Sequence, residues 1–243
     1  MKQTTLLRRS ICMLLTLSLL LALVPQLNWT VSASAAEPFY VPDETVNIIF
    51  DTDLDSDVDD AGAMGLLHSY VQEGKVNLLA TIGCCRSGFA APAMSAYNHY
   101  YGAGDVVVGV NTASPANYGS KYQSTIARFY YNTVGHDYYA LTALQAYRQV
   151  LSEAKDNSVV IVVAGTISNI YALMLSPADE ISELTGMELV AKKVKLLSIM
   201  AGAYPSGLEN NMRFDAAASI YVAEKSPVPV LWADLGATSG VTT

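Results

Sequence analysis

The feature that most constrains the fold is a short apolar run that passes directly into a dense group of carboxylates. Val46–Phe50 is largely apolar, and six aspartates then fall within the ten residues Asp51–Asp60. Apolar residues at helical spacing follow, from Ala61 to Val71. This pattern predicts a buried strand, an acidic loop and a helix whose first turn begins at the Asp59–Asp60 pair. In a parallel α/β sheet, such a strand end opens into the crevice where ligands bind.

So many like charges beside a buried strand are unfavourable unless something positive lies among them. A helix N-terminus favours nearby anions by only ~0.3–1 kcal/mol, which is too little to offset six aspartates. A hard divalent cation with oxygen ligands would offset the repulsion. The sequence therefore predicts a metal site at the end of the first strand.

The first 36 residues have the features of an export signal. Basic residues precede the apolar stretch Ile11–Val24, and small residues follow at Ser32–Ala36. The apolar stretch is shorter than the ~20 residues that a membrane-spanning helix needs. We therefore expect a signal peptide at residues 1–36, one domain at residues 37–243, and a secreted or otherwise extracytoplasmic protein with no stable membrane anchor.

The charge balance narrows the classes of partner. Without Lys2, Arg8 and Arg9, the 14 basic residues become 11 against 22 acidic ones, and the formal net charge becomes −11. Nucleic acids and anionic membranes bind basic patches, so neither is expected as a partner. Cys84 and Cys85 are adjacent and match neither a disulfide framework nor a zinc site. We expect them to be small buried residues.

The rest of the chain alternates apolar runs with helical patterns. Strands are predicted at Val46–Phe50, Val76–Ile82, Val106–Val110, Val159–Ala164, Val194–Met200 and Val228–Trp232. Helices are predicted at Asp60–Gln72, Ala90–Tyr101, Ala140–Glu153, Ser168–Leu175 and Phe214–Glu224. Apolar strands separated by helices predict an α/β fold, with a mainly parallel sheet and helices on both faces.

Local patterns leave several interpretations of the acidic loop. Asp51, Asp53 and Asp55 alternate as in an EF-hand, but Ser56 stands at the position of the turn glycine and Gly62 at that of the bidentate glutamate. An apolar strand that ends in Asp-x-Asp is also typical of haloacid-dehalogenase-type phosphatases, in which Asp51 would be the nucleophile. The residues after Asp53 do not match that family. A solvated acidic turn is the non-functional alternative.

A third interpretation is a family resemblance. Asp51-Thr52-Asp53, followed by Asp59-Asp60-Ala61 at a helix start, resembles the N-terminal signature of the nucleoside hydrolase (inosine–uridine-preferring) family. That signature is Asp-Thr-Asp-x-Gly-x-Asp-Asp-Ala. Here Asp55 replaces the glycine, and two extra residues precede the paired aspartates. The insertion leaves Asp57 as an alternative to Asp59 for one member of the pair.

Later segments resemble the same family in the same order, across nearly all of the chain after the signal. These segments are Leu78–Gly83, Asn98, Val162–Asn169, Leu197–Ala203, Glu209–Asn211 and Asp215–Ala217. Cys84 stands where the family has an asparagine after its second strand. The family also continues past the last strand with an aspartate that completes the calcium site and a histidine near the leaving base. The resemblance therefore implies either that the C-terminal part is missing here or that the protein is a degenerate relative. No local acidic residue can be assigned to the lost role, but Asp234 sits at a strand end and could approach the site.

The resemblance implies a nucleoside-hydrolase-like, Rossmann-like open sheet. It also implies hydrolysis of N-glycosidic bonds in nucleosides or related ribosyl compounds, with Ca²⁺ as the cofactor. Asp53 would be both general base and metal ligand, Asp60 a metal ligand, and Ser168 a ligand through its carbonyl, although Ser168 also suits a helix N-cap. The remaining residues would bind the ribose hydroxyls: Asp59, Glu209 and Asn211.

Two alternative functions stay open. One is a non-catalytic relative that binds nucleosides or sugars, and the other is the phosphatase that uses Asp51. His68 is expected to pack in the interior, whereas His136, in an aromatic-rich loop, is either a group near the leaving base or a surface residue. In each case the partner is a small molecule whose base the sequence does not identify, and a homo-oligomer is permitted.

Overall fold

The computed structural model describes residues 44–55, 57–117 and 119–234. The predicted signal peptide at residues 1–36 and the stretch 235–243 lie outside these ranges. Within the described ranges, no helix has both the length and the apolar character needed to cross a membrane.

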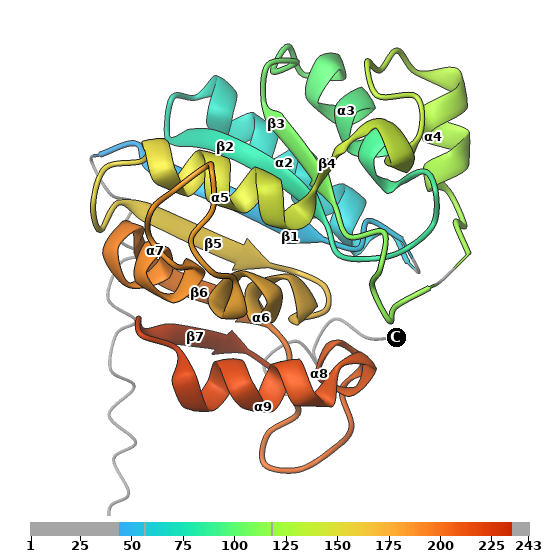
Figure 1. Ribbon diagram of the computed structural model, residues 1–243. Helices are drawn as coiled ribbons and strands as arrows, with labels where there is room; N and C mark the ends of the chain where they lie inside the picture. Colours follow the sequence, from blue (N-terminus) through green and yellow to red (C-terminus); the bar gives the residue numbers. More distant parts are fainter. Residues whose placement is uncertain (1–43, 56, 118, 235–243) are drawn as a thin grey trace, which may run out of the picture. The chain divides into compact units, whose positions relative to one another are not determined.

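One parallel sheet organises the described residues (Figure 1). Its strands are β1 (Val46–Thr52), β2 (Val76–Gly83), β3 (Val107–Val110), β4 (Leu141–Thr142), β5 (Val159–Val163), β6 (Val194–Met200) and β7 (Val230–Ala233). Their order is β4-β3-β2-β1-β5-β6-β7, and every neighbouring pair is parallel. The prediction of an α/β fold with a parallel sheet is confirmed.

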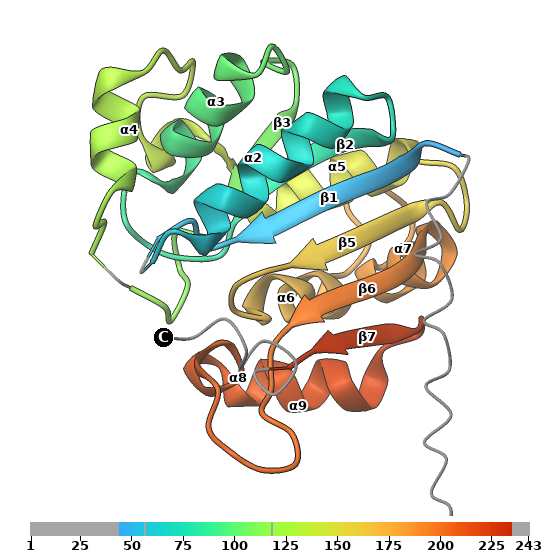
Figure 2. The ribbon, with the colours of Figure 1, turned by 180° about the vertical axis from the view of Figure 1, so that it is seen from behind.

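Helices cover both faces of the sheet (Figures 1 and 2). The helices are α2 (Asp59–Gln72), α3 (Ala90–Tyr100), α4 (Gln123–Phe129), α5 (Ala143–Glu153), α6 (Ser168–Leu175), α7 (Gly186–Lys193), α8 (Asn210–Phe214) and α9 (Ala216–Lys225). Helices α2 and α3 lie on one face, and α5, α6 and α7 lie on the other. Each face has its own apolar core, one around Phe50 and Met64 and one around Ile49 and Leu151.

The sheet order places the first acidic residues at a special position. The chain runs outward from β1 through β2 and β3 to β4, and then returns to the other side of β1 with β5. The order of the strands therefore reverses between β1 and β5. At such a switch point, the loops that follow the two strands diverge onto opposite faces and leave a crevice at the carboxyl ends of the strands. The loop that begins at Asp53 lies at this crevice.

Several predicted boundaries differ from the structure. The predicted helix Ala140–Glu153 begins only at Ala143, because Leu141 and Thr142 pair with β3 as the short strand β4. Thr142 then caps α5 in a capping box with Gln145. The predicted helix Phe214–Glu224 corresponds to α9, which begins only at Ala216. Asp215, whose carboxylate accepts a hydrogen bond from the Ala218 N–H, separates α9 from the short helix α8, which was not predicted.

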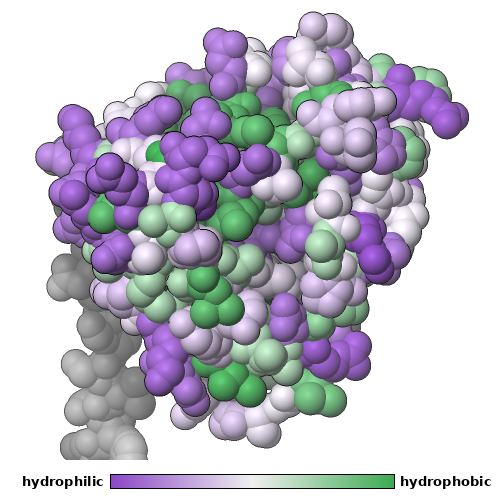
Figure 3. Space-filling model, in the orientation of Figure 1, coloured by the Kyte–Doolittle hydropathy of each residue, from purple (hydrophilic) through white to green (hydrophobic). Residues whose placement is uncertain are grey.

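Two other helices, α4 and α7, were not predicted. The start of α7 carries a recognisable signal, because Thr185 and Glu188 form a capping box. Helix α4 begins at Gln123 with no side-chain cap and is only seven residues long. The surface of the domain is mixed: on the face drawn in Figure 3, hydrophobic residues lie in small groups separated by hydrophilic ones.

Candidate active site at the carboxyl ends of β1 and β5

A cavity of about 330 Å³ lies at the switch point of the sheet. This volume is within the ~300–1,000 Å³ range of small-molecule sites. Residues from the β1–α2 loop and from the segment around α8 line it, including Asp53, Asp57, Asp59, Asp60, Glu209 and Asn211. The structure thus brings together every predicted site residue except Ser168, from segments about 150 residues apart in the sequence.

A strained turn at the end of β1 positions the central carboxylates. Leu54 has φ of 47°, in the left-handed region, which costs a non-glycine residue about 1–2 kcal/mol. Two hydrogen bonds hold it, because its N–H donates to Thr52 Oγ1 and to Asp60 Oδ2, each at 2.9 Å. Its side chain is completely buried. The turn therefore ties the start of α2 to the end of β1, and backbone strain of this kind concentrates at functional sites.

Asp53 and Asp60 form the electrostatic centre of the cavity. Both are buried. The pKa of Asp60 is raised to about 9, mainly by burial, with contributions from the charge of Asp53 and from a hydrogen bond between the two carboxyl groups. Asp53 Oδ1 also accepts the Asp55 N–H at 3.0 Å. Two carboxylates held together in this way disfavour a second negative charge, and a bound cation would reverse that preference.

Asp51 lies one layer deeper, beneath the cavity. Its carboxylate accepts hydrogen bonds from the Tyr147 hydroxyl at 2.6 Å and from Asn169 Nδ2 at 3.0 and 3.2 Å. Burial raises the pKa of Asp51 to about 7, and these hydrogen bonds partly oppose that rise. Because Asp51 has no solvent exposure, a phosphate ester cannot approach it as the phosphatase alternative requires. Asp51 instead joins β1 to α5 and α6.

Two further polar groups near the cavity lack partners. Asp55 Oδ2 and the Tyr122 hydroxyl are buried and have no hydrogen-bond partner among the described residues. Burial and the negative charges of Asp60 and Asp53 raise the pKa of Tyr122 well above its ordinary value. Tyr122 is therefore a neutral donor beside the carboxylates. The sequence analysis missed it, because it precedes an uncapped helix and lies far from the acidic loop in sequence.

The alternative between Asp57 and Asp59 remains open. Both side chains line the cavity and are exposed. A hydrogen bond from Asp57 raises the pKa of Asp59, with burial and the charge of Asp57 adding to the rise. Helix α2 begins at Asp59, as predicted. The two residues form an exposed pair on the lining of the cavity.

Glu209 and Asn211 line the opposite wall. The Glu209 carboxylate accepts three backbone N–H groups, from Gly202, Asn211 and Met212, at 2.7–3.1 Å. It thereby caps the short helix α8. Asn211 donates from Nδ2 to the Met200 carbonyl at 2.9 Å, which leaves its side-chain oxygen without a hydrogen bond to the described residues. These contacts hold the wall of the cavity in place.

Ser168 is buried but does not line the cavity. Its hydroxyl donates to Asp215 Oδ2 at 2.8 Å, so it joins α6 to α9. The alternative role as a helix N-cap is wrong, because Ile167 occupies that position and no side chain caps α6. Asp234, the local substitute considered for the missing ligand, lies beside Gly202 after β7 and is likewise absent from the lining of the cavity.

His68, His136 and the two cysteines lie outside the lining of the acidic cavity. His68 is buried, with Nε2 at 3.0 Å from Asn98 Oδ1 and its ring stacked on Tyr101, so the expected interior position is confirmed. His136 is exposed, accepts the Tyr138 N–H and lines a separate cavity, which agrees with the surface alternative. Cys84 and Cys85 are both buried and free, as expected.

The donors at the cavity suit a hard cation. Asp53 and Asp60 supply carboxylate oxygens, and neither histidine nor cysteine lines the cavity, which favours Ca²⁺ or Mg²⁺ over zinc. In the described ranges, no three His, Cys, Asp or Glu side chains are already arranged as a metal site. A cation held by Asp53 and Asp60 would therefore take its other ligands from backbone oxygens and water, which is common for Ca²⁺.

Comparison with known proteins supports the fold. No protein-family profile matches the chain, and no curated protein matches it. Among solved structures, the chain is similar to a plant nucleoside hydrolase, the PpNRh1 enzyme, with a TM-score of 0.52 and 17% sequence identity. The match covers 79% of this chain and 60% of the plant enzyme. The chain therefore has a nucleoside-hydrolase-like fold and spans less than two thirds of that neighbour.

Proposed function

We propose that this chain is an exported, calcium-dependent hydrolase of N-glycosidic bonds in nucleosides or related ribosyl compounds. One observation carries the proposal. The adjacent buried carboxylates Asp53 and Asp60 face a cavity of about 330 Å³ at the switch point of the sheet. The fold of a plant nucleoside hydrolase, which this chain resembles at 17% identity, supports the same reaction class.

Hydrolysis of an N-glycosidic bond proceeds through a transition state with positive charge on the ribosyl group. Carboxylates around the sugar stabilise that charge. In this proposal, Asp53 takes the proton from the attacking water as general base, and Asp60 holds Asp53 and the Leu54 N–H in place. Ca²⁺, which Asp53 and Asp60 would hold, would lower the pKa of a water ligand.

The outer residues bind the sugar. Asp59, or Asp57 in its place, accepts a ribose hydroxyl at the mouth of the cavity. Asn211 offers a side-chain oxygen that forms no hydrogen bond within the described residues. A carboxylate has about four lone-pair sites, and three N–H groups already use the Glu209 carboxylate, so Glu209 can accept about one ribose hydroxyl without losing its cap.

Release of free ribose from inosine and uridine by the purified chain tests the proposal. With Ca²⁺ present we expect turnover, which excess chelator abolishes and added Ca²⁺ restores. Asp53→Asn should lower kcat by about 10³-fold, because a general base contributes ~10²–10⁴-fold. The matched control is Asp105→Asn, which removes an exposed carboxylate outside the cavity and should leave kcat unchanged.

The same assay separates the alternatives. Turnover that survives both chelation and Asp53→Asn would refute the proposed mechanism. Binding of ribose or inosine by calorimetry, with no turnover at any Ca²⁺ concentration, would instead identify a non-catalytic binding protein.

A further inference from the structure

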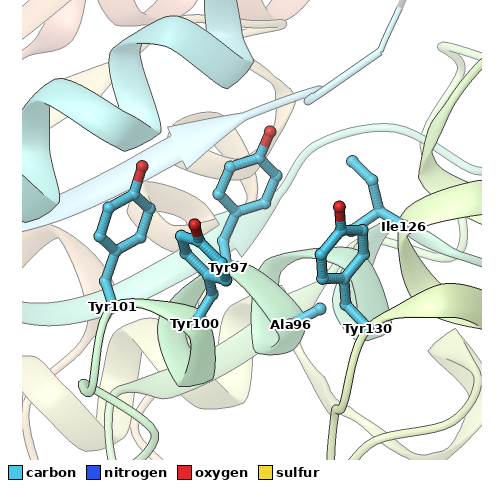
Figure 4. A pocket seen from close by; sticks show the side chains of 6 residues that line it. All are labelled: Ala96, Tyr97, Tyr100, Tyr101, Ile126 and Tyr130. Atoms are coloured by element: carbon cyan, nitrogen blue, oxygen red, sulfur yellow. The ribbon is translucent and has the colours of Figure 1, made fainter.

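A second cavity, distinct from the acidic one, lies between α3 and α4. Its volume is about 200 Å³, and it is lined by Ala96, Tyr97, Tyr100, Tyr101, Ile126 and Tyr130. Four of these six residues are tyrosines, and none carries a charge. Figure 4 shows the four rings side by side, with their hydroxyls on the same side. The proposed hydrolysis uses none of these residues.

The rings do not form a slot for a flat ligand. The ring of Tyr100 is nearly perpendicular to that of Tyr101, at 83°, and to that of Tyr130, at 85°. A planar base stacks best between parallel rings, whereas a compact, roughly spherical group can contact walls of different orientation. The cavity is also smaller than the ~300 Å³ typical of sites for drug-sized ligands. The edge-to-face packing of these rings, with centroids 5.1 and 6.3 Å apart, therefore leaves no parallel slot for a planar base, and the volume suits only a small group.

The electrostatics favour a cation. The faces of aromatic rings are negative and attract cations within about 6 Å. The whole chain has a formal net charge of −8, which disfavours an anionic ligand.

The lining also discriminates among cations. A primary ammonium is strongly hydrated and needs hydrogen-bond acceptors to replace its water, but no carboxylate lines this cavity. A methylated ammonium has no N–H group and presents methyl groups, which suit the aromatic walls and the apolar Ala96 and Ile126. Aromatic cages for quaternary ammonium groups follow the same principle.

We propose that the cavity between α3 and α4 binds a methylated ammonium ion of the choline type. Two of its walls are open to solvent, since Tyr100 is 71% exposed and Tyr130 is 53% exposed. A free small molecule or the headgroup of a choline lipid can therefore reach it. The site lies outside the acidic cavity, and the proposal does not depend on the hydrolase activity.

Calorimetric titration of the purified chain with choline chloride tests the site. Choline should bind saturably, and 3,3-dimethyl-1-butanol, its uncharged isostere, should bind at least tenfold more weakly, as should ethanolamine. The double substitution Tyr100→Ala with Tyr130→Ala should weaken choline binding at least tenfold. Because both side chains are exposed, the variant should remain folded, which its circular dichroism spectrum would verify.

Two control variants test whether the faces of the tyrosine rings are responsible for choline binding. Replacing both residues by Phe keeps the ring faces and should retain binding within about threefold. Tyr138→Ala with Tyr139→Ala removes two tyrosines that are 81% and 76% exposed but lie outside the cavity, and should change nothing. Sedimentation with phosphatidylcholine vesicles, with choline as competitor, distinguishes the lipid headgroup from the free ion.

Four results would overturn the proposal. These are the absence of choline binding, equal binding of the uncharged isostere, equal loss in the Phe and Ala variants, and tighter binding of glucose or adenine than of choline. The last two would show that hydroxyl contacts or base stacking, rather than attraction of a cation by the rings, determine what the cavity binds.

Discussion

Two regions of this domain bury charge, and they do so in opposite ways. Arg148, on α5, has no solvent exposure and is held within an ion pair, with Nε at 2.7 Å from Asp179 Oδ2. It also donates to Ser176 Oγ and to the carbonyls of Ser182 and Leu184 at 2.9–3.0 Å. In the acidic cavity, carboxyl groups instead lie against each other, and Asp55 Oδ2 is buried without a hydrogen-bond partner in the described structure.

The contrast shows how a structural buried charge differs from a functional one. The partners of Arg148 are all within the protein, so its charge fixes the segment between α6 and α7 and leaves nothing for a ligand. At the end of β1, the charge of Asp53 helps to raise the pKa of Asp51 and of Asp60, and a cation from outside would relieve that cost. Perturbed groups of this kind concentrate at functional sites.

Removing Arg148 should produce the largest stability change. Arg148→Met keeps the length of the side chain but leaves Asp179, Ser176 Oγ and two part-buried carbonyls without their donor. We expect the free energy of unfolding to fall by about 3 kcal/mol, because several hydrogen bonds from a charged donor are lost and each contributes ~1.5–3 kcal/mol. Urea denaturation measures it. The control Arg128→Met, on an exposed part of α4, should change stability by less than about 0.5 kcal/mol. If both substitutions lowered the free energy of unfolding equally, Arg148 would have no special structural role.

Calcium should stabilise the folded protein through the carboxylates of the acidic cavity. The contacts of Arg148 should make no contribution to this effect. At a concentration of 100 times Kd, a ligand that binds only the folded state adds about 2.7 kcal/mol. We expect a matching rise in Tm on adding Ca²⁺ to the chelated protein, and none for Asp60→Asn. A rise of the same size in that variant would place the calcium elsewhere.

Neutralising one carboxylate in each region should have opposite effects. Asp60→Asn keeps an acceptor for the Leu54 N–H and removes the proton uptake that the buried Asp60 carboxyl requires on folding at pH 8, so the metal-free protein should gain about 1 kcal/mol. Asp179→Asn should instead lower the stability, because it leaves the buried Arg148 charge without its carboxylate. Thermal unfolding in chelator compares the two directly. If both substitutions changed the stability in the same direction, the two regions would not differ in how they bury charge.

The gain from Asp60→Asn should depend on pH. The pKa of Asp60 is raised from 3.8 to about 9 on folding, so between these values the folded carboxyl keeps a proton that the unfolded chain releases. The stability of the metal-free wild type therefore falls as pH rises through this range. In Asp60→Asn this contribution disappears, so the difference between the two proteins should grow from pH 4 to pH 9.

His68 is an intermediate case and should give the smallest effect. Its Nε2 bonds Asn98, whereas its Nδ1 is buried with no partner among the described residues. Burial lowers the pKa of His68, an effect that the Asn98 hydrogen bond partly opposes. The folded state thus prefers the neutral ring, so stability is complete above pH 6.5 and falls as pH drops below it. His68→Gln should flatten this dependence by less than about 1 kcal/mol between pH 5 and 7.5, as followed by urea denaturation.

The sequence predicted most of the fold because its strands carry their signal locally. Val159–Val163 and Val194–Met200 are apolar runs long enough to identify without any tertiary contact. The short strand β4 was missed because two residues carry no periodicity, and its pairing with β3 arises only in the folded chain. Helix α4 was missed for a related reason: it is short and has no cap.

The residues of the candidate site that lie together in one short stretch of sequence were predicted. The residues that reach the site from distant segments were not. Asp53, Asp59 and Asp60 stand in one acidic loop, and Glu209 and Asn211 stand in one short segment, so a motif could find them. Tyr122, beside those carboxylates, and Tyr147, bound to Asp51 from 96 residues away, belong to no motif.

The sequence by itself determined that a buried strand ends in a carboxylate cluster, and therefore that this end of the sheet repels further negative charge. Only the tertiary structure decided which carboxylates face one another, that Arg148 pairs with Asp179, and that four tyrosines from α3 and the end of α4 line a cavity. The reason is physical. Charge and hydrophobic periodicity are properties of neighbouring residues, whereas the partners of a buried polar group are set by how separate elements pack.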